Sequence, residues 1–396
     1  MALSRHTKHG RVVARDGEQL LLRCEDGPHL HTPAGQAKPG DLVRVRSGDD
    51  PEIVVSYSGT DYPEPNTELY RLSEERIAGL RARATVLREI RHYFAEHDFL
   101  EVQPPTLVPT PGLEVNIRAI GAGEGYLITS PEFAMKRLLA GGLERIYATS
   151  ACFRAEEVGS HHNTEFTMLE WYRGWAGLDE ILWDTEQLVR RSVQAVRGKD
   201  AALVDGREID LRGPWRKLTV SEAFTTWCGF ALLGDESADE LRRKMSVAGI
   251  AVGETREWDD LFYLAFVERI DPGLAQLDHA LVLVDWPSAL AALARVKPED
   301  PRWALRFEVY IGGVELANAF DELTCAKEQR RRFELERTQR RERGLPVYEI
   351  DEKFLAALEE GLPPSAGIAL GVDRLAMLSV DSDEIRTVCA FVGDEL

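Results

Sequence analysis

The chain has 396 residues, a net charge of −19 and 44% hydrophobic residues. At about 100–200 residues per domain, this length predicts two or three domains with a large core. No run of about 18 apolar residues occurs, which excludes a membrane-spanning helix, and residues 1–10 lack the apolar stretch of a signal peptide. Five widely spaced cysteines predict neither a disulfide framework nor a structural zinc site. We therefore expect a cytoplasmic protein, and the negative charge disfavours a protein whose whole surface binds nucleic acid.

The first 60 residues are predicted to form a small β-rich domain. Turn sequences such as Asp16-Gly17 and Pro39-Gly40 separate four short β-like runs, at residues 11–14, 19–23, 41–46 and 53–55. This density of strands is typical of a small barrel like the oligonucleotide/oligosaccharide-binding (OB) fold. The segment contains eight Lys/Arg and eight Asp/Glu residues and is therefore neutral. Two roles stay open for it: recognition of an acceptor molecule, or docking and stabilisation alone.

Residues 61–70 include Pro63 and are interpreted as a linker, and residues 71–396 as one larger domain. Two stretches, residues 77–94 and Gly177–Val196, have the three- and four-residue apolar spacing of helices. In the first, the predicted apolar stripe is Ile77, Leu80, Ala84, Leu87, Ile90 and Phe94. Strand-like runs are interleaved with the helices without a regular alternation. We therefore predict an α+β domain with a mostly antiparallel sheet, and neither of the common glycine-rich nucleotide-binding motifs is present.

The first candidate site segment consists of two strand-like runs, Cys152–Glu156 and Glu165–Tyr172, joined by a loop that contains His162 and Asn163. Alternate residues of a strand share a face, so such a hairpin would present an arginine, carboxylates and an aromatic ring to one pocket. The planar guanidinium of arginine suits phosphate. The same pattern also fits a solvent-exposed strand face with ordinary ion pairs, and the spacing alone leaves both interpretations open.

The second candidate segment, residues 307–322, contains the turn Gly312-Gly313. A two-residue turn there pairs Ile311 with Val314 and Tyr310 with Glu315, which places Glu308 about 7–8 Å from Glu315 on one face. Two carboxylates at this separation suit Mg²⁺ ions whose other ligands are phosphates and waters, or they are simply solvated. Further along, Asn318, Phe320 and Glu322 have the opposite parity to Glu308. They can share its site only if a β-bulge interrupts the ladder, and we expect that bulge near Ala317–Ala319.

The third candidate segment is Ser365–Leu375, in which a strand-like run passes into a helix at Gly371-Val-Asp-Arg374. Arg374 in the first turn is in a position to reach a polyphosphate, although an ordinary ion pair at a helix start explains this short motif equally well. Together and in this order, however, the three segments resemble the signature motifs of class II aminoacyl-tRNA synthetases. Motif 1 corresponds to residues 100–105, motif 2 to residues 153–156 with the following loop, and motif 3 to residues 371–374.

The sequence is similar to the lysyl branch of that class and most similar to the elongation factor P lysyltransferase family. The resemblance covers about residues 70–396, and the matching blocks are Thr129–Phe133, His162-Asn163, Phe166–Arg173, Arg306–Tyr310, Glu315–Asn318 and Gly367–Arg374. It implies a class II catalytic domain behind the small β-rich domain. It also implies a homodimer, because motif 1 builds a two-fold interface in these enzymes.

The resemblance also assigns site residues. Arg154 and Arg374 would be the catalytic arginines, and Glu308 and Glu315 the Mg²⁺ ligands. ATP would contact Arg154, Glu156, His162, Asn163, Phe166, Glu315, Leu316, Gly371 and Arg374. The amino acid would contact Ser130, Pro131, Glu132, Glu170, Tyr172, Asn318, Glu322 and Ala369. Several carboxylates around a lysine with two ammonium groups are physically reasonable, because charge-assisted hydrogen bonds are strong in a confined site.

The activity implied is ATP-dependent activation of lysine as an adenylate and its transfer to a lysine side chain of elongation factor P. Ala369 matches the lysyltransferases, whereas lysyl-tRNA synthetases generally have glycine there, and this favours (R)-β-lysine over α-lysine. Ala319 departs from the glycine usual in the family. One alternative is a lysyl-tRNA synthetase, or a paralogue that charges another carrier; against it, residues 1–60 are small and neutral for an anticodon-binding domain. A binding module without enzymatic activity fits poorly, because the arginines and carboxylates are all present.

Overall fold

The computed structural model describes residues 7–64 and 67–396. The chain divides into two compact units, Met1–Ile77 and Ala78–Leu396. No helix among the described residues is both long and apolar enough to cross a membrane.

The first unit contains a five-stranded antiparallel sheet in the order β3-β2-β1-β4-β5. Its strands are β1 (Lys8–Asp16), β2 (Gln19–Cys24), β3 (Gly27–His31), β4 (Leu42–Val45) and β5 (Glu52–Val55). A small core around Val12, Leu20, Leu22 and Val43 holds the sheet together. The prediction of a small all-β module is confirmed. One strand more than predicted is present, because the polar sequence of β3 hides its alternation.

The stretch interpreted as a linker ends in regular structure. Thr67 caps helix α1 (Glu68–Arg71), its side chain accepting a hydrogen bond from the Tyr70 amide. Arg23 Nη1 donates to the Leu72 carbonyl at 2.6 Å, and Arg23 Nη2 lies 2.6 Å from Glu74 Oε1. The compact first unit therefore extends to Ile77, beyond the boundary expected at residues 70–71.

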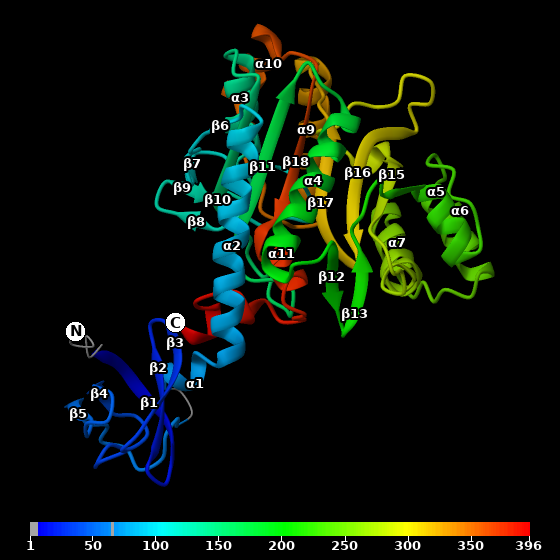
Figure 1. Cartoon of the computed structure of the whole chain (residues 1–396). Helices are drawn as coiled ribbons and strands as arrows, with labels where there is room; N and C mark the ends of the chain where they lie inside the picture. The colour runs from blue at the N-terminus through cyan, green and yellow to red at the C-terminus, as the bar shows by residue number, and fades with distance from the viewer. Residues whose placement is uncertain (1–6, 65–66) are drawn as a thin grey trace. The chain divides into compact units, whose positions relative to one another are not determined.

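The second unit is built on an eight-stranded sheet in the order β14-β15-β16-β17-β18-β11-β10-β6 (Figure 1). Neighbouring strands run antiparallel except for β14 with β15 and β10 with β6. This confirms the predicted α+β fold with a mostly antiparallel sheet. The strands are β6 (Leu100–Glu101), β10 (Arg145–Phe153), β11 (Glu165–Gly174), β14 (Arg216–Thr219), β15 (Leu281–Pro287), β16 (Trp303–Ile311), β17 (Val314–Asp321) and β18 (Ser365–Gly371).

One face of this sheet is covered by helices α2 (Glu74–Glu96), α4 (Leu178–Arg197) and α11 (Val372–Leu378). The main core lies between them, where Ile90 and Phe94 of α2 meet sheet residues such as Trp171 and Ile368. The apolar stripe predicted for α2 is wrong at Ala84, which is exposed. The buried positions on that side are Ala82 and Val86, because alanine carries too little apolar surface to fix the orientation of a helix by itself.

The opposite face carries helices α3 (Glu132–Ala140), α9 (Ala326–Glu342) and α10 (Glu352–Gly361), which share a second core with Ile146, Ala148 and Tyr172 of the sheet. Between β14 and β15 the chain forms a helical group with its own core, in which Phe262 and Phe266 pack on Trp286. Its helices are α5 (Val220–Ala223), α6 (Ala238–Val247), α7 (Trp258–Ala265) and α8 (Asp271–Leu274). Short strands complete the unit: β7 (Leu107–Val108), β8 (Gly121–Ala122), β9 (Gly125–Leu127), β12 (Ala201–Val204) and β13 (Arg207–Asp210).

Candidate active site

A single row of paired residues crosses four neighbouring strands of the eight-stranded sheet. Glu170 of β11 pairs with Ala369 of β18, Ala369 pairs with Asn318 of β17, and Asn318 pairs with Glu308 of β16. Directly paired residues of neighbouring strands point to the same face. The sheet therefore brings together four side chains that the sequence assigned to one site from three separate segments.

This row depends on a β-bulge. Val309 pairs with Ala317, but the next pair is Tyr310 with Glu315, so Leu316 is the extra residue. The predicted hairpin pairs, Ile311 with Val314 and Tyr310 with Glu315, are confirmed. The bulge itself is also present, but it lies at Leu316, nearer the turn than the expected Ala317–Ala319. An extra residue reverses the parity of the strand that follows, and this reversal turns Asn318 to the face of Glu308.

The amino-acid end of the row is a buried polar cluster. Ser130 Oγ donates to Glu170 Oε1 at 2.6 Å, and Tyr172 Oη donates to Glu170 Oε2 at 3.1 Å. Ser130 Oγ also accepts the Glu132 amide at 3.0 Å, at the start of α3. One turn further on, the Lys136 ammonium pairs with Glu132 and lies 2.5 Å from Glu322 Oε2. Glu170, Glu322 and Lys136 are each about 1% exposed.

Burial dominates the electrostatics of this cluster. It raises the pKa of Glu170 to about 8, with the negative charge of Glu132 as the second cause. It also raises the pKa of Glu322 to about 8, although the Lys136 ammonium opposes the shift. Burial disfavours the Lys136 cation as well, but Glu132 and Glu322 outweigh burial and raise its pKa. The cluster therefore has more carboxylates than cations and suits a positively charged ligand.

A second group of predicted residues surrounds Arg154, at the end of β10. Its guanidinium carbon lies 5.1 Å from the centroid of the Phe166 ring and its Nη1 lies 3.7 Å from Glu157. Arg154 Nε is buried and has no hydrogen-bond partner in the part of the chain that the structure describes. A buried donor of this kind suits an anionic ligand. Phe166 is partly exposed beside it, so the pair can hold a phosphate and a stacked ring together.

Two predicted nucleotide contacts in the following loop point elsewhere. Glu156 has a positive φ of 67° and pairs with Arg118, and Asn163 Nδ2 donates to the Glu165 carbonyl at 2.8 Å. Both residues lie near Arg154 in sequence, but the Glu156 side chain pairs with Arg118, outside this loop, and the Asn163 side chain is bonded to the start of β11. Contacts with a nucleotide would require them to exchange these partners.

Arg374 lies at the start of α11, where it links two other predicted residues. Its Nη1 donates to the main-chain carbonyl of Glu315 at 2.6 Å, and its Nη2 lies 2.7 Å from His162 Nε2. Burial, reinforced by the positive charge of Arg374, lowers the pKa of His162. The imidazole is therefore neutral near pH 7 and leaves the positive charge of Arg374 available to an anion.

Glu308 and Glu315 are the only carboxylates proposed as magnesium ligands, and their environments differ. Glu308 is buried; Arg306 pairs with it and Tyr310 Oη donates to its Oε2 at 2.6 Å. Burial raises its pKa to about 7 against the opposing effect of Arg306, whereas the Glu315 side chain is 44% exposed. Among the described residues no three metal-binding side chains cluster. Mg²⁺ commonly takes one or two carboxylates and completes its shell with phosphates and waters, so this pair fits an ion that arrives with ATP.

Comparisons with known proteins identify the family of the chain. The family model described as "tRNA synthetases class II (D, K and N)" matches residues 67–395. Curated proteins named elongation factor P--(R)-beta-lysine ligase are similar to the chain: 42% identical over 328 residues in Vibrio cholerae and 38% over 330 residues in Erwinia tasmaniensis. The chain belongs to the class II tRNA synthetase family, in the group of these ligases. The two matches cover 80% of this chain but 95% and 96% of the relatives, so this class II chain is longer than either of them.

Four other residues that the resemblance assigned to the site carry no polar side chain. The Leu316 side chain packs into the core on the sheet face that α2, α4 and α11 cover, so only its main chain can contact a nucleotide. Gly371 is the N-cap of α11 and pairs with Met168. Pro131 precedes α3 as its N-cap residue, and Ala369 lies between Glu170 and Asn318 in the row described above.

Three charged residues with raised pKa values near the candidate site were not predicted from the sequence: Lys136, Glu114 and Glu336. Lys136 follows Glu132 by four residues on a helix, a spacing that pairs opposite charges. That signal was available in the sequence. Glu114 lies in an irregular loop and Glu336 in a strongly charged helix, where nothing in the pattern separates them from surface carboxylates.

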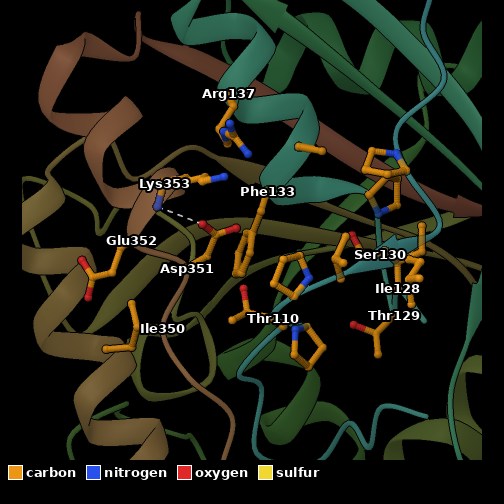
Figure 2. A pocket seen from close by; sticks show the side chains of 18 residues that line it. Thr110, Ile128, Thr129, Ser130, Phe133, Arg137, Ile350, Asp351, Glu352 and Lys353 are labelled. Atoms are coloured by element: carbon orange, nitrogen blue, oxygen red, sulfur yellow. Dashed lines mark hydrogen bonds between the residues drawn. The ribbon is translucent and has the colours of Figure 1, made fainter. Parts of the chain in front are cut away.

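A cavity of about 330 Å³ adjoins the amino-acid cluster (Figure 2). The proline-rich loop 105–111 forms part of its wall, and Ser130 and Phe133 line it together with Arg137 and Lys353. Ser130 lines this cavity and also donates to Glu170, so this residue belongs both to the cavity wall and to the cluster.

Proposed function

We propose that the protein activates lysine, preferentially (R)-β-lysine, as an aminoacyl-adenylate with ATP and transfers it to a lysine side chain of elongation factor P. The observation that supports the proposal is the row Glu170–Ala369–Asn318–Glu308, in which a proposed amino-acid contact and a proposed Mg²⁺ ligand lie on one face of the sheet. The names of the similar ligases indicate the amino acid and the acceptor of the proposed reaction.

In the first step a carboxylate oxygen of lysine attacks the α-phosphorus of ATP, and pyrophosphate leaves. The negative charge on the phosphate oxygens needs cationic partners. Arg154, whose Nε has no hydrogen-bond partner among the described residues, is the candidate at the α-phosphate. Arg374, which contacts the Glu315 carbonyl, is the candidate for another phosphate. Phe166 offers its ring to the adenine, and Glu170 and Tyr172 receive the distal ammonium group of the lysine.

Magnesium belongs to the proposal through Glu308 and Glu315. A bound ion supplies charge neutralisation and orientation of the phosphates. Glu308 uses one lone pair of each oxygen for Arg306 and Tyr310, which leaves further lone pairs for an ion. Arg306 and Tyr310 keep this carboxylate oriented toward the site.

In the second step the neutral amine of the acceptor lysine attacks the acyl carbon, AMP leaves with the bonding electron pair, and a proton is released from the nitrogen. A protein nucleophile is not required. Cys152 is the cysteine closest to Phe166, and burial raises the pKa of its thiol far above the neutral range. A thiol in this state is a poor nucleophile, which supports direct transfer from the adenylate.

A homodimer and a cytoplasmic location complete the proposal. Strand β6 of motif 1 lies at the edge of the eight-stranded sheet and exposes Leu100, as expected of an edge that a second copy can cover. Elongation factor P acts in translation, and an enzyme that modifies it would work in the same compartment.

The decisive experiment offers the full chain a choice of acceptors. The enzyme is incubated with ATP, Mg²⁺ and radiolabelled α-lysine or (R)-β-lysine, together with elongation factor P or unfractionated tRNA. We expect label in elongation factor P, with (R)-β-lysine preferred, and no label in a factor whose acceptor lysine is replaced by arginine. Label in tRNA alone would contradict the proposal.

A further inference from the structure

The Glu114 carboxylate has one buried oxygen that receives no hydrogen bond from the described residues. Its Oε2 is excluded from solvent and has no hydrogen-bond partner within the described ranges. The carboxylate folds back over Gly112: a Cβ added to that glycine would lie 2.3 Å from Glu114 Oε2 and 3.3 Å from Thr129 Oγ1. Gly112 and Thr129 both line the cavity of Figure 2, so the orphan oxygen lies just behind its wall.

The main chain holds this residue in place. Arg340 of α9, which is about 1% exposed, donates from Nη1 to the carbonyl of Glu114 at 2.7 Å and to that of Ile117 at 3.0 Å. Arg340 Nε donates to the Pro346 carbonyl at 2.6 Å. The buried Arg340 guanidinium thus donates these hydrogen bonds to main-chain carbonyls of the loop and not to the Glu114 carboxylate.

Charged groups of the candidate site shift the pKa of the Glu114 carboxyl. Burial and then the negative charge of Glu132 raise its pKa, and a hydrogen bond from the main-chain amide of Glu114 itself, then Arg154 and Lys136, act in the opposite direction. Glu336 of α9 adds a further carboxyl group whose pKa burial and Glu114 raise to about 8. Glu114 is therefore within electrostatic range of Arg154 in the proposed phosphate site and of Glu132 and Lys136 in the amino-acid cluster.

The amino group nearest to the substrate carboxylate would occupy this region. In the proposed function Arg154 attracts the carboxylate and α-phosphate end of the substrate, and Glu170 with Tyr172 receives the distal ammonium group. The remaining ammonium group lies between these two ends. Glu132 is an incomplete partner for it, because Lys136 already neutralises that carboxylate. Glu114 Oε2, which has no hydrogen-bond partner among the described residues, can accept a hydrogen bond from that ammonium group.

We propose that Glu114 Oε2 accepts a hydrogen bond from the α- or β-amino group of the lysine substrate, which makes Glu114 a specificity-determining residue. The inference rests on the proposed function and adds a residue to it. A buried carboxylate without a partner is costly to the free protein, and a substrate ammonium group removes that cost on binding. Glutamine at this position keeps the shape and loses the charge.

The test uses the full chain and measures ATP–pyrophosphate exchange. For Glu114→Gln, the KM for α-lysine and for (R)-β-lysine is expected to rise about 10- to 100-fold, the effect of losing one hydrogen bond to a charged group. The inhibition constant of 6-aminohexanoate, a lysine without that amino group, should change less than about twofold. Glu114→Asp retains the charge and should raise the KM of lysine less than Glu114→Gln does. Glu124→Gln, an exposed position on the turn between β8 and β9, should behave as wild type.

Three outcomes would overturn the inference. The first is an unchanged KM for both lysines in Glu114→Gln. The second is an equal loss of affinity for lysine and 6-aminohexanoate, which would assign Glu114 a structural role. The third, if Glu114→Gln does not fold, is a wild-type enzyme in which 6-aminohexanoate binds as tightly as lysine. Failure of the proposed function looks different, because the wild-type enzyme would then show no lysine-dependent exchange at all.

Discussion

Lys136 Nζ lies 2.5 Å from Glu322 Oε2, and both side chains are about 1% exposed. The same ammonium group pairs with Glu132, so one cation serves two carboxylates in the free protein. A lysine substrate brings a second cation to this cluster. Lys136 therefore keeps the pocket folded without substrate, and it leaves enough negative charge for a substrate to neutralise.

Lys136→Met should lower the free energy of unfolding by about 3–5 kcal/mol, because it leaves buried carboxylates without their partner. Denaturant unfolding followed by circular dichroism measures the change. The double variant Lys136→Met/Glu322→Gln should recover part of the loss. Lys199→Met removes an exposed ion pair with Glu208 and should cost less than about 1 kcal/mol. Equal losses for the two lysine variants would contradict the assigned role of burial.

Arg374→Ala should abolish adenylate formation without unfolding the protein. The Arg374 side chain is 21% exposed and contacts the Glu315 carbonyl and His162, so its removal leaves the core intact. Pyrophosphate exchange should fall at least about 100-fold, the scale on which electrostatic stabilisation of a transition state acts. The thermal unfolding midpoint serves as the control and should stay within a few degrees. Exchange within a few-fold of wild type would show that the phosphate site is misassigned.

The fold could be predicted further than the site. Alternation and turn chemistry predicted the hairpin at Gly312-Gly313 and its first two pairs, because these signals are local. The bulge at Leu316 could be anticipated only as a requirement of the site, and its position was missed, since no residue type marks it. Lys136 and Glu114 act through partners that lie far apart in the sequence. Their burial follows from tertiary packing, which no local pattern reports.

Glu308→Gln and Glu315→Gln should each raise the Mg²⁺ concentration required for half-maximal exchange and lower the maximal rate. The effect should be larger for Glu308, because its buried position and its bonds to Arg306 and Tyr310 fix its orientation. A Mg²⁺ titration at saturating ATP measures both quantities. Asp278→Gln, at an exposed site on the second unit, is the matched control. Titration curves that overlay the wild type in both glutamine variants would exclude the metal assignment.

The affinity for lysine should increase between about pH 7 and pH 9. Burial raises the pKa of Glu170 to about 8 in the free protein, so the carboxyl is largely protonated at pH 7 and ionised at pH 9. The substrate side-chain ammonium, with an ordinary pKa of about 10.4, stays charged over this range. The KM for lysine should therefore fall as pH rises. In Glu170→Gln the KM should be higher and should fall less steeply with pH than in the wild type, and a wild-type KM that rises with pH would contradict this reasoning.

Ala369→Gly should shift the amino-acid preference toward α-lysine. Ala369 pairs with Glu170 on one side and with Asn318 on the other, so its methyl group lies between two proposed substrate contacts. Removing it creates space at the position where the α- and β-amino acids differ in shape. One methyl group in a pocket changes discrimination by about 1–3 kcal/mol, which is roughly a 10- to 200-fold change in the ratio of kcat/KM values. Parallel exchange assays with both lysines measure that ratio. Ala366 lies on the same strand, but its side chain is in the core on the sheet face that α2, α4 and α11 cover. Ala366→Gly therefore controls for a general effect of glycine in β18. If both glycine variants keep the wild-type ratio, the methyl group of Ala369 does not select the substrate.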